Sequence, residues 1–118
     1  MYKVKKPIAG FENIMEAKLY EINDHFATLK LGEIIFTLIN PFSLDKNYSF
    51  EIPADAKALL EIDENNPVLV YCNLVKNEPF KESIVNFKAP ILINPKNNTL
   101  AQIICDEYEY KKIGDFVK

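Results

Sequence analysis

The segment Asn86–Asn94 reads Asn-Phe-Lys-Ala-Pro-Ile-Leu-Ile-Asn, and the prediction of the fold starts from it. Its apolar side chains recur at every second position, which is the period of an extended strand that turns one face to a core. The opposite face carries a mostly polar row that contains Asn86, Lys88 and Asn94. Because Pro90 has no backbone N–H to donate, the strand is predicted to lie at a sheet edge or to contain a bulge. Such an edge is a candidate docking surface for another molecule.

Further extended segments are spread along the chain. Strands are predicted over residues 17–23, 26–31, 34–39, 48–52, 68–75 and 100–105. The runs 34–39 and 68–75 are apolar on both faces, so each is expected to be a central strand that is covered on both sides. Residues 1–6 carry three lysines and are expected to form a solvated terminus.

The stretch Ala54–Ile62 is the one predicted helix, because its apolar residues form a stripe and Asp55 lies in the first turn. A helix of about two to three turns is not stable alone, so it should lie across an open end of the sheet as a cap. Residues 91–94 and 100–105 are expected to pair as a hairpin. These elements predict an all-β, mainly antiparallel fold, a small closed or partly closed β-barrel of about eight strands with one short capping helix.

The composition limits the kinds of partner. The chain has 118 residues, 48% of them hydrophobic, which suits one domain over residues 1–118. It carries 17 acidic and 14 basic residues for a formal charge of -3, and every basic residue is a lysine. Arginine is the main reader of guanine and phosphate, so direct nucleic-acid binding is not expected, whereas partners with positive surface fit well. A cytoplasmic location without membrane contact is expected, because no signal segment or membrane-spanning run is found.

The residue patterns contain no motif for catalysis or for a bound cofactor. The three glycines are isolated, and no serine has a catalytic motif around it. His25 is the single histidine and is expected on the surface next to a turn. Cys72 and Cys105 lie in apolar runs without metal-ligating neighbours, so they are predicted to be reduced core residues. The sequence therefore predicts a binding protein with no enzyme activity, metal or cofactor; the alternative, a small β-barrel that binds a metabolite or catalyses a hydrolysis, needs a deep pocket.

Residues 86–94 resemble the most characteristic segment of the flagellar assembly factor FliW family. Three further runs agree with that family in the same order: residues 7–12, residues 40–42 with 48–53, and residues 102–104. The similarity extends from about residue 7 to about residue 110. Residues 111–118 differ from the basic, proline-containing tail that is common in Gram-positive members, so no inference that depends on that tail is carried over.

The resemblance implies a regulatory role that involves two protein partners. FliW-like proteins bind flagellin in the cytoplasm, and they also bind the carbon storage regulator CsrA, an RNA-binding protein that represses translation of flagellin mRNA. Export of flagellin frees the FliW-like protein to sequester CsrA, so the two partners share one limiting protein. CsrA is blocked either directly, by acidic mimicry of RNA, or by docking elsewhere, and the resemblance implies the second more than the first.

The resemblance also implies which residues contact a partner. The residues that match the family runs are Asn40, Pro41, Phe42, Phe50, Glu51, Asn86, Lys88, Pro90 and Asn94. For Pro41, Phe50 and Pro90, a structural role in turns or in the core fits the pattern equally well. The acidic segment 106–110, which contains two tyrosines, is either a solvated strand edge or chain end, or a contact for a basic partner.

Overall fold

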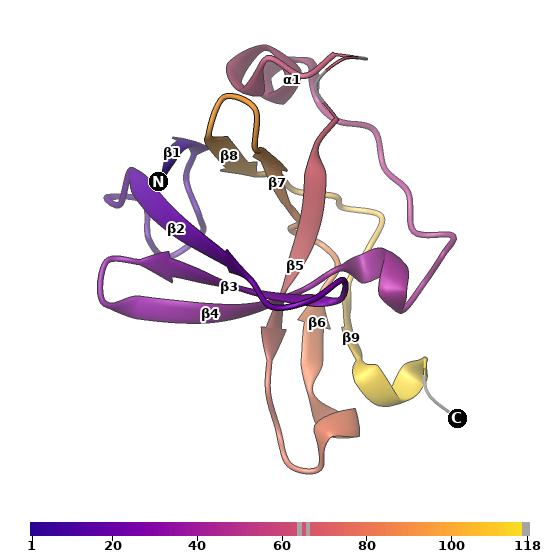
Figure 1. The fold of residues 1–118 in the computed structure, drawn as a ribbon. Helices are drawn as coiled ribbons and strands as arrows, with labels where there is room; N and C mark the ends of the chain where they lie inside the picture. Colours follow the sequence, from indigo (N-terminus) through magenta and orange to yellow (C-terminus); the bar gives the residue numbers. More distant parts are fainter. Residues whose placement is uncertain (64, 66, 117–118) are drawn as a thin grey trace.

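The computed structural model describes residues 1–63, 65 and 67–116 and consists mostly of β-strands with one short α-helix (Figure 1). The strands are β1 (Tyr2–Lys6), β2 (Glu16–Glu21), β3 (Phe26–Leu31), β4 (Ile34–Ile39), β5 (Leu69–Val75), β6 (Ile84–Asn86), β7 (Ile91–Asn94), β8 (Thr99–Gln102) and β9 (Tyr110–Lys112). The helical segments are α1 (Ala54–Leu60) and the 3-10 turns η1 (Pro41–Ser43), η2 (Phe80–Glu82) and η3 (Ile113–Asp115). Among the described residues, no helix combines the length and the apolar character needed to cross a membrane.

Seven of the strands close into a barrel, which confirms the predicted fold class. The sheet runs in the order β4-β3-β2-β1-β8-β7-β5, and pairing between β4 and β5 joins its two ends. Neighbouring strands are antiparallel except β1 and β8, which run parallel. β6 and β9 extend the sheet outward from β5, and β9 is the only strand of the described residues that pairs with a single neighbour.

Side chains fill the interior of the barrel. The inward residues of β3 are Ala27, Leu29 and Leu31, and all three are fully buried. They pack with inward residues of the other strands, including Val4 and Leu100. A second cluster of buried side chains lies against β5 and β6 outside this interior, and a third lies beneath α1. The barrel is therefore a packed scaffold of the kind that small barrels form.

Most of the local predictions are confirmed. β2, β3, β4 and β5 agree with the predicted strands to within about two residues at each end, which is the usual spread of such boundaries. The hairpin of β7 and β8 and the helix α1 also lie where they were expected. α1 contacts β1 and β8, at one end of the barrel. In the acidic segment 106–110, only the last residue enters a strand, at the free edge of β9.

The segment Asn86–Asn94 is neither one strand nor a sheet edge, which corrects the prediction. β6 ends at Asn86 and β7 begins at Ile91, with a bent loop of residues 87–90 between them. β6 lies between β5 and β9, and β7 lies between β5 and β8, so each strand has partners on both sides. The backbone of this segment is therefore not available to pair with a strand of another protein.

Hydrogen bonds from the segment that follows β8 hold the 87–90 loop in place. Cys105 N donates to the Lys88 carbonyl at 2.6 Å, and Ile103 N donates to the Pro90 carbonyl at 3.1 Å. Pro90 is buried in the interruption between the strands, where its missing N–H removes no bond from a ladder. The alternation of apolar residues continues through the loop, so a single strand was predicted where the structure has two.

Three other expectations are wrong. Residues 1–6 are not a solvated terminus, because β1 lies between β2 and β8 and buries Val4 in the barrel. Residues 48–52 form no strand; Tyr48 instead packs into the cluster against β5 and β6. β4 is not covered on both sides, since its first two residues are exposed.

Candidate partner-binding site

The run Asn40–Phe42 forms the turn that follows β4. Asn40 Oδ1 accepts a hydrogen bond from Phe42 N at 3.0 Å, which caps the 3-10 turn η1. Pro41 takes the first position of η1, where its missing N–H is not needed, and its side chain is buried. Phe42 follows it with 41% of its surface exposed. The turn therefore presents one aromatic ring to solvent.

Tyr48 is the centre of an aromatic cluster that joins the family runs. Its side chain is buried, and its hydroxyl donates to the Phe87 carbonyl at 2.7 Å. The ring centroid of Tyr48 lies 4.6 Å from Tyr108, 5.2 Å from Phe87, 5.4 Å from Phe50 and 5.9 Å from Phe42. The pairs with Phe87 and Tyr108, at interplanar angles of 69° and 63°, have the edge-to-face arrangement that aromatic pairs prefer, and the pairs with Phe42 and Phe50, at 52° and 56°, are tilted. Tyr48 therefore fixes η1 relative to the loop that follows β6.

Sequence reasoning did not identify Tyr48 and Tyr108 as members of the site. Tyr108 Oη donates to the Ser49 carbonyl at 2.7 Å and accepts from Ser49 N at 3.1 Å, so it ties the chain end to the segment before α1. The available signal was the position of Tyr48 at the start of the family run 48–53. Tyr108 lies outside the four runs, and nothing in its local sequence marks its contact with Ser49.

Asn86 shapes the loop after β6. Its Oδ1 accepts hydrogen bonds from Lys88 N and Ala89 N, each at 3.1 Å, which folds the loop into a compact bend. Gln102 Nε2 donates to the Ala89 carbonyl at 3.0 Å. Gln102 Oε1 in turn accepts from Ala9 N at 2.8 Å, so the first family run and the last family run are both attached to this loop.

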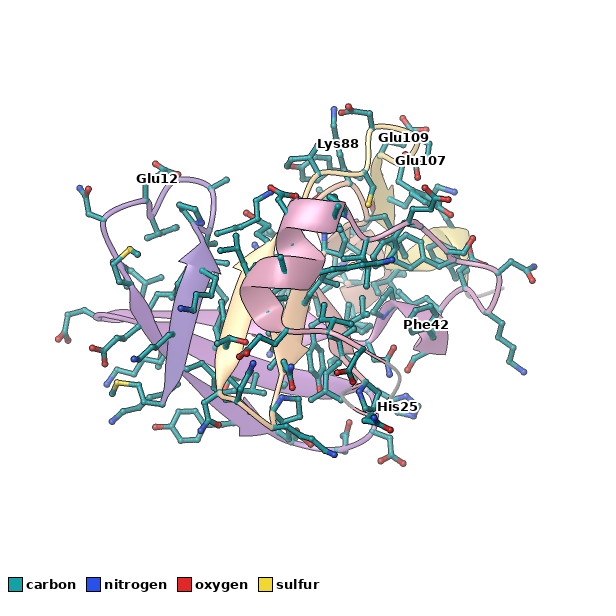
Figure 2. The ribbon with its side chains drawn as sticks, turned by 90° about the horizontal axis from the view of Figure 1, so that it is seen from above. Glu12, His25, Phe42, Lys88, Glu107 and Glu109 are labelled. Carbon is teal, nitrogen blue, oxygen red and sulfur yellow. The ribbon has the colours of Figure 1, made fainter. Side chains whose placement is uncertain are left out.

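Lys88 is the exposed residue of this loop. Figure 2 shows it at the same end of the molecule as Glu107 and Glu109. The Lys88 ammonium lies 4.0 Å from the Asp106 carboxylate, and both groups are exposed, so this ion pair adds little to stability. The lysine is therefore available to an acidic group of a partner, and the carboxylates beside it are available to a basic one.

The nine residues that the resemblance singles out divide into three groups. Three of them are exposed: Phe42 itself belongs to the aromatic cluster, and Glu51 and Lys88 follow Phe50 and Phe87 of that cluster in the chain. These three residues are named here the Phe42 face, within which Figure 2 shows Lys88 apart from Phe42. Buried or half-buried residues form the frame beneath that face: Asn40, Pro41, Phe50, Asn86 and Pro90. The remaining residue, Asn94, lies elsewhere.

Asn94 is fully buried, so its placement in an outward polar row is wrong. Its Nδ2 donates to the Leu60 carbonyl at 2.7 Å, and its Oδ1 accepts from Lys96 N at 3.1 Å. Asn97 Nδ2 donates to the same Leu60 carbonyl at 2.9 Å. Because the last carbonyls of a helix lack partners within the helix, these two amides satisfy the C-terminal end of α1.

The family model described as FliW protein matches residues 1–113. The chain belongs to the FliW family. It is 41% identical over 127 residues to flagellar assembly factor FliW 1 of Wolinella succinogenes, which covers 100% of this chain and 98% of that protein. Flagellar assembly factor FliW of Sulfurimonas denitrificans is 40% identical over 109 residues, which covers 90% of this chain and 86% of that protein. A crystal structure of the flagellar assembly factor FliW matches with a TM-score of 0.81 and 27% identity, over 93% of this chain and 80% of that one.

His25 and Ser43 form an exposed contact in this FliW-family chain, between the β2–β3 turn and η1. His25 Nδ1 lies 2.7 Å from Ser43 Oγ. Nucleophilic catalysis needs a base that a third group orients, in a site that excludes water. Both side chains are exposed, and over residues 1–63, 65 and 67–116 no carboxylate is hydrogen-bonded to His25. The pair therefore lacks the orientation and the enclosure of a nucleophilic site.

A small hollow opens at the mouth of the FliW-family barrel. Its volume is ≈ 180 Å³, and the polar residues among its lining are Asn73, Asn86, Gln102 and Tyr110. Pockets that enclose small molecules usually measure about 300–1,000 Å³. The deep pocket that a metabolite-binding barrel would need is therefore not found at this mouth.

The two cysteines of this FliW-family chain are free and buried, as predicted. Burial raises the pKa of the Cys72 thiol to about 12 and that of Cys105 to about 11. Only the thiolate reacts, and at pH 8 about one Cys105 thiol in a thousand is ionised. We therefore expect the native chain to resist iodoacetamide at pH 8, whereas both cysteines react after unfolding in guanidinium. Mass spectrometry counts the labels, and fast labelling of the native chain would contradict the buried placement.

Proposed function

We propose that this chain is a flagellar assembly factor that binds flagellin and antagonises CsrA, and so relieves repression of flagellin mRNA translation. The observation that carries the proposal is the match to the FliW family over residues 1–113, with relatives at 40% and 41% identity that are named flagellar assembly factors. Flagellin and CsrA then draw on the same limited pool of this protein. Flagellin that binds this protein therefore lowers the amount of the protein that is free to bind CsrA.

The Phe42 face supplies the chemistry for such binding. It combines an aromatic side chain with an acid and a lysine, on a frame that Tyr48 and Asn86 hold in place. Protein interfaces gain most of their affinity from a few well-supported aromatic or charged anchors inside a polar rim. Since β6 and β7 are paired on both sides, a partner would engage this region with side chains and not by adding a strand.

The acidic residues near Lys88 suit a basic partner. Asp106, Glu107 and Glu109 are exposed, and the chain as a whole carries a charge of -3. An RNA-binding regulator is expected to present basic surface, and complementary potentials speed the encounter of two proteins. We favour docking outside the RNA-binding face of CsrA, with an indirect effect on RNA, over acidic mimicry, as the family resemblance implies.

The proposed action is binding without catalysis, and it takes place in the cytoplasm. Flagellin before export and a regulator of translation are both cytoplasmic, so a protein that binds both acts there. Direct contact with nucleic acid or membrane is not part of the proposal. The exposed His25–Ser43 contact and the small hollow at the barrel mouth agree with a protein that works through its surface.

Replacement of Phe42 by alanine tests the Phe42 face. We expect the affinity for at least one of flagellin and CsrA to fall about tenfold or more, because truncation of an aromatic anchor costs that much. Leu59→Ala is the matched control, since Leu59 lies on α1 with 42% exposure against 41% for Phe42. Isothermal titration calorimetry gives the affinities, and thermal unfolding monitors the fold. Unchanged binding of both partners by the Phe42 variant, or an equal loss in the Leu59 variant, would exclude this face as the contact.

A further inference from the structure

The outer surface of β2, β3 and β4 combines lysines with exposed apolar side chains, in a chain whose net charge is negative. Residues that face outward pair across the three strands in two rows: Lys18, Lys30 and Ile35 in the first, and Tyr20, Thr28 and Thr37 in the second. Lys76 and Phe80 lie beside the second row. Neither row contains a carboxylate. Glu16, the outward carboxylate of β2, is in register with Lys3 of β1 and lines the hollow that also takes in Lys18 and Lys30.

Lys18 and Lys30 stand directly opposite each other in the antiparallel pair of β2 and β3. Like charges at opposed positions destabilise a sheet, whereas opposite charges stabilise it. Within the part of the chain that the structure describes, no carboxylate lies within 4.0 Å of either ammonium. The fold therefore keeps a repulsive pair that a negative group from outside the chain would neutralise.

Apolar side chains lie on the same surface. Tyr20, Ile22, Ile35 and Phe80 are between 47% and 65% exposed. A hollow of ≈ 390 Å³ runs between Ile22, Phe80 and the outer side of β3 and β4. A second hollow, of ≈ 450 Å³, lies at the other end of β3 and takes in Lys18 and Lys30. Burial of exposed isoleucines against an apolar side chain stabilises a complex more than their contact with a nucleic-acid base. The chain also has no arginine, so a protein partner is favoured over a nucleic acid.

Much of the backbone of this surface is already paired. β3 is paired along its whole length, while β5 pairs with β4 at Thr37–Ile39 and β1 pairs with β2 at Glu16 and Ala17, so a partner on the outer face contacts side chains. An α-helix that lies along a sheet presents one apolar stripe with charges on its flanks. From Phe26 to Lys30, β3 extends for about 13 Å, which corresponds to about nine residues of helix. α1 leaves this surface open, because it contacts β1 and β8.

We propose that the outer face of β2, β3 and β4 docks an acidic, amphipathic α-helix of another protein. The apolar stripe of that helix packs on Tyr20, Ile22, Ile35 and Phe80, and its carboxylates pair with Lys18, Lys30 and Lys76. This face is made of residues other than the Phe42 face. It goes beyond the proposed function, and its test uses neither flagellin nor CsrA.

The probe is a fluorescein-labelled helical peptide of about 16 residues with a leucine stripe and glutamates elsewhere. The control peptide has the same leucine stripe with lysines in place of the glutamates. Fluorescence anisotropy with the full chain should show saturable binding of the acidic peptide, weaker at high salt, and no binding of the basic one. The double variant Lys18→Glu/Lys30→Glu should bind the acidic peptide about tenfold or more weakly. The matched control Lys46→Glu/Lys57→Glu makes the same charge change at exposed lysines elsewhere and should bind normally.

The single variant Lys30→Glu separates binding from folding. It places opposite charges across β2 and β3, so its thermal unfolding midpoint should rise while its affinity for the acidic peptide falls. The double variant restores a like-charge pair and should unfold near the wild-type temperature. A lysine with only a structural role would not give opposite changes in stability and binding.

Three results would overturn the proposal. The first is the absence of saturable binding by the acidic peptide, or equal binding by the Lys18→Glu/Lys30→Glu variant. The second is a concentration-dependent dimer that Ile35→Glu abolishes, because the face would then bind a second copy of this chain. The third is displacement of the peptide by a single-stranded RNA oligonucleotide, which would assign the lysines to nucleic acid.

Discussion

Replacement of Tyr48 by alanine is expected to lower the free energy of unfolding by about 4 kcal/mol, because a large buried aromatic ring is lost. The ring is buried among Phe42, Phe50, Phe87 and Tyr108, so truncation leaves a cavity at the point where the family runs meet. Chemical denaturation followed by far-ultraviolet circular dichroism measures the change. A loss below about 1 kcal/mol would show that the cluster does not hold these segments together.

Two further variants separate the contributions of the Tyr48 side chain. Tyr48→Phe keeps the ring but removes the donor to the Phe87 carbonyl, and should cost about 1–2 kcal/mol because a buried acceptor loses its partner. Tyr110→Ala is the control, since Tyr110 is exposed, and should change stability by no more than about 0.5 kcal/mol. A Tyr48→Phe variant as unstable as Tyr48→Ala would mean that the hydrogen bond, and not packing, dominates.

Replacement of Asn94 by leucine should cost about 3 kcal/mol, somewhat less than the loss of the Tyr48 ring. The side chains have similar size, so the loss comes from polar groups: Lys96 N has no acceptor, and the Leu60 carbonyl keeps only the bond from Asn97. Asn47→Leu is the control at an exposed position. Equal stability of the two variants in urea would contradict the role of Asn94 in holding the end of α1.

The variant Asn94→Asp adds a pH dependence with a defined sign. A carboxyl at this buried position, facing the Leu60 carbonyl, should have a higher pKa in the folded state than in the unfolded chain. The folded state then binds more protons than the unfolded state, so the variant loses stability relative to wild type as pH rises from about 4 to about 7. Denaturation curves of both proteins at the two pH values measure this loss of stability. The same difference in free energy of unfolding between variant and wild type at both pH values would contradict the buried placement.

The sequence predicts those parts of the fold that depend on local periodicity. The strands 26–31, 34–39 and 68–75 are rich in apolar and β-branched residues, and the structure places strands there. β1 was missed because Val4 is its only buried residue and its neighbours are mostly lysines. Its pairing with β8 joins segments from opposite ends of the chain, and local patterns contain no information about such a contact.

The break in the segment Asn86–Asn94 has a similar cause. Alternation predicts which side chains share a face, but the loop depends on the Asn86 side chain and on backbone donors from residues 103 and 105. In the same way, Asn94 falls on the polar side of the pattern, yet the end of α1 covers it. The family runs drew attention to this region. They could not show that most of the matching residues form the frame and that only Phe42, Glu51 and Lys88 stay exposed.

Competition between the two proposed partners is the most direct test of the proposed function. The purified chain is mixed at micromolar concentration with CsrA, with flagellin, or with both, and each mixture is separated by size-exclusion chromatography. We predict that the chain co-elutes with each partner alone and that flagellin added to the CsrA complex moves CsrA into the free fraction. Elution of the chain by itself in all three mixtures would contradict the proposal, and so would a CsrA complex that flagellin leaves unchanged.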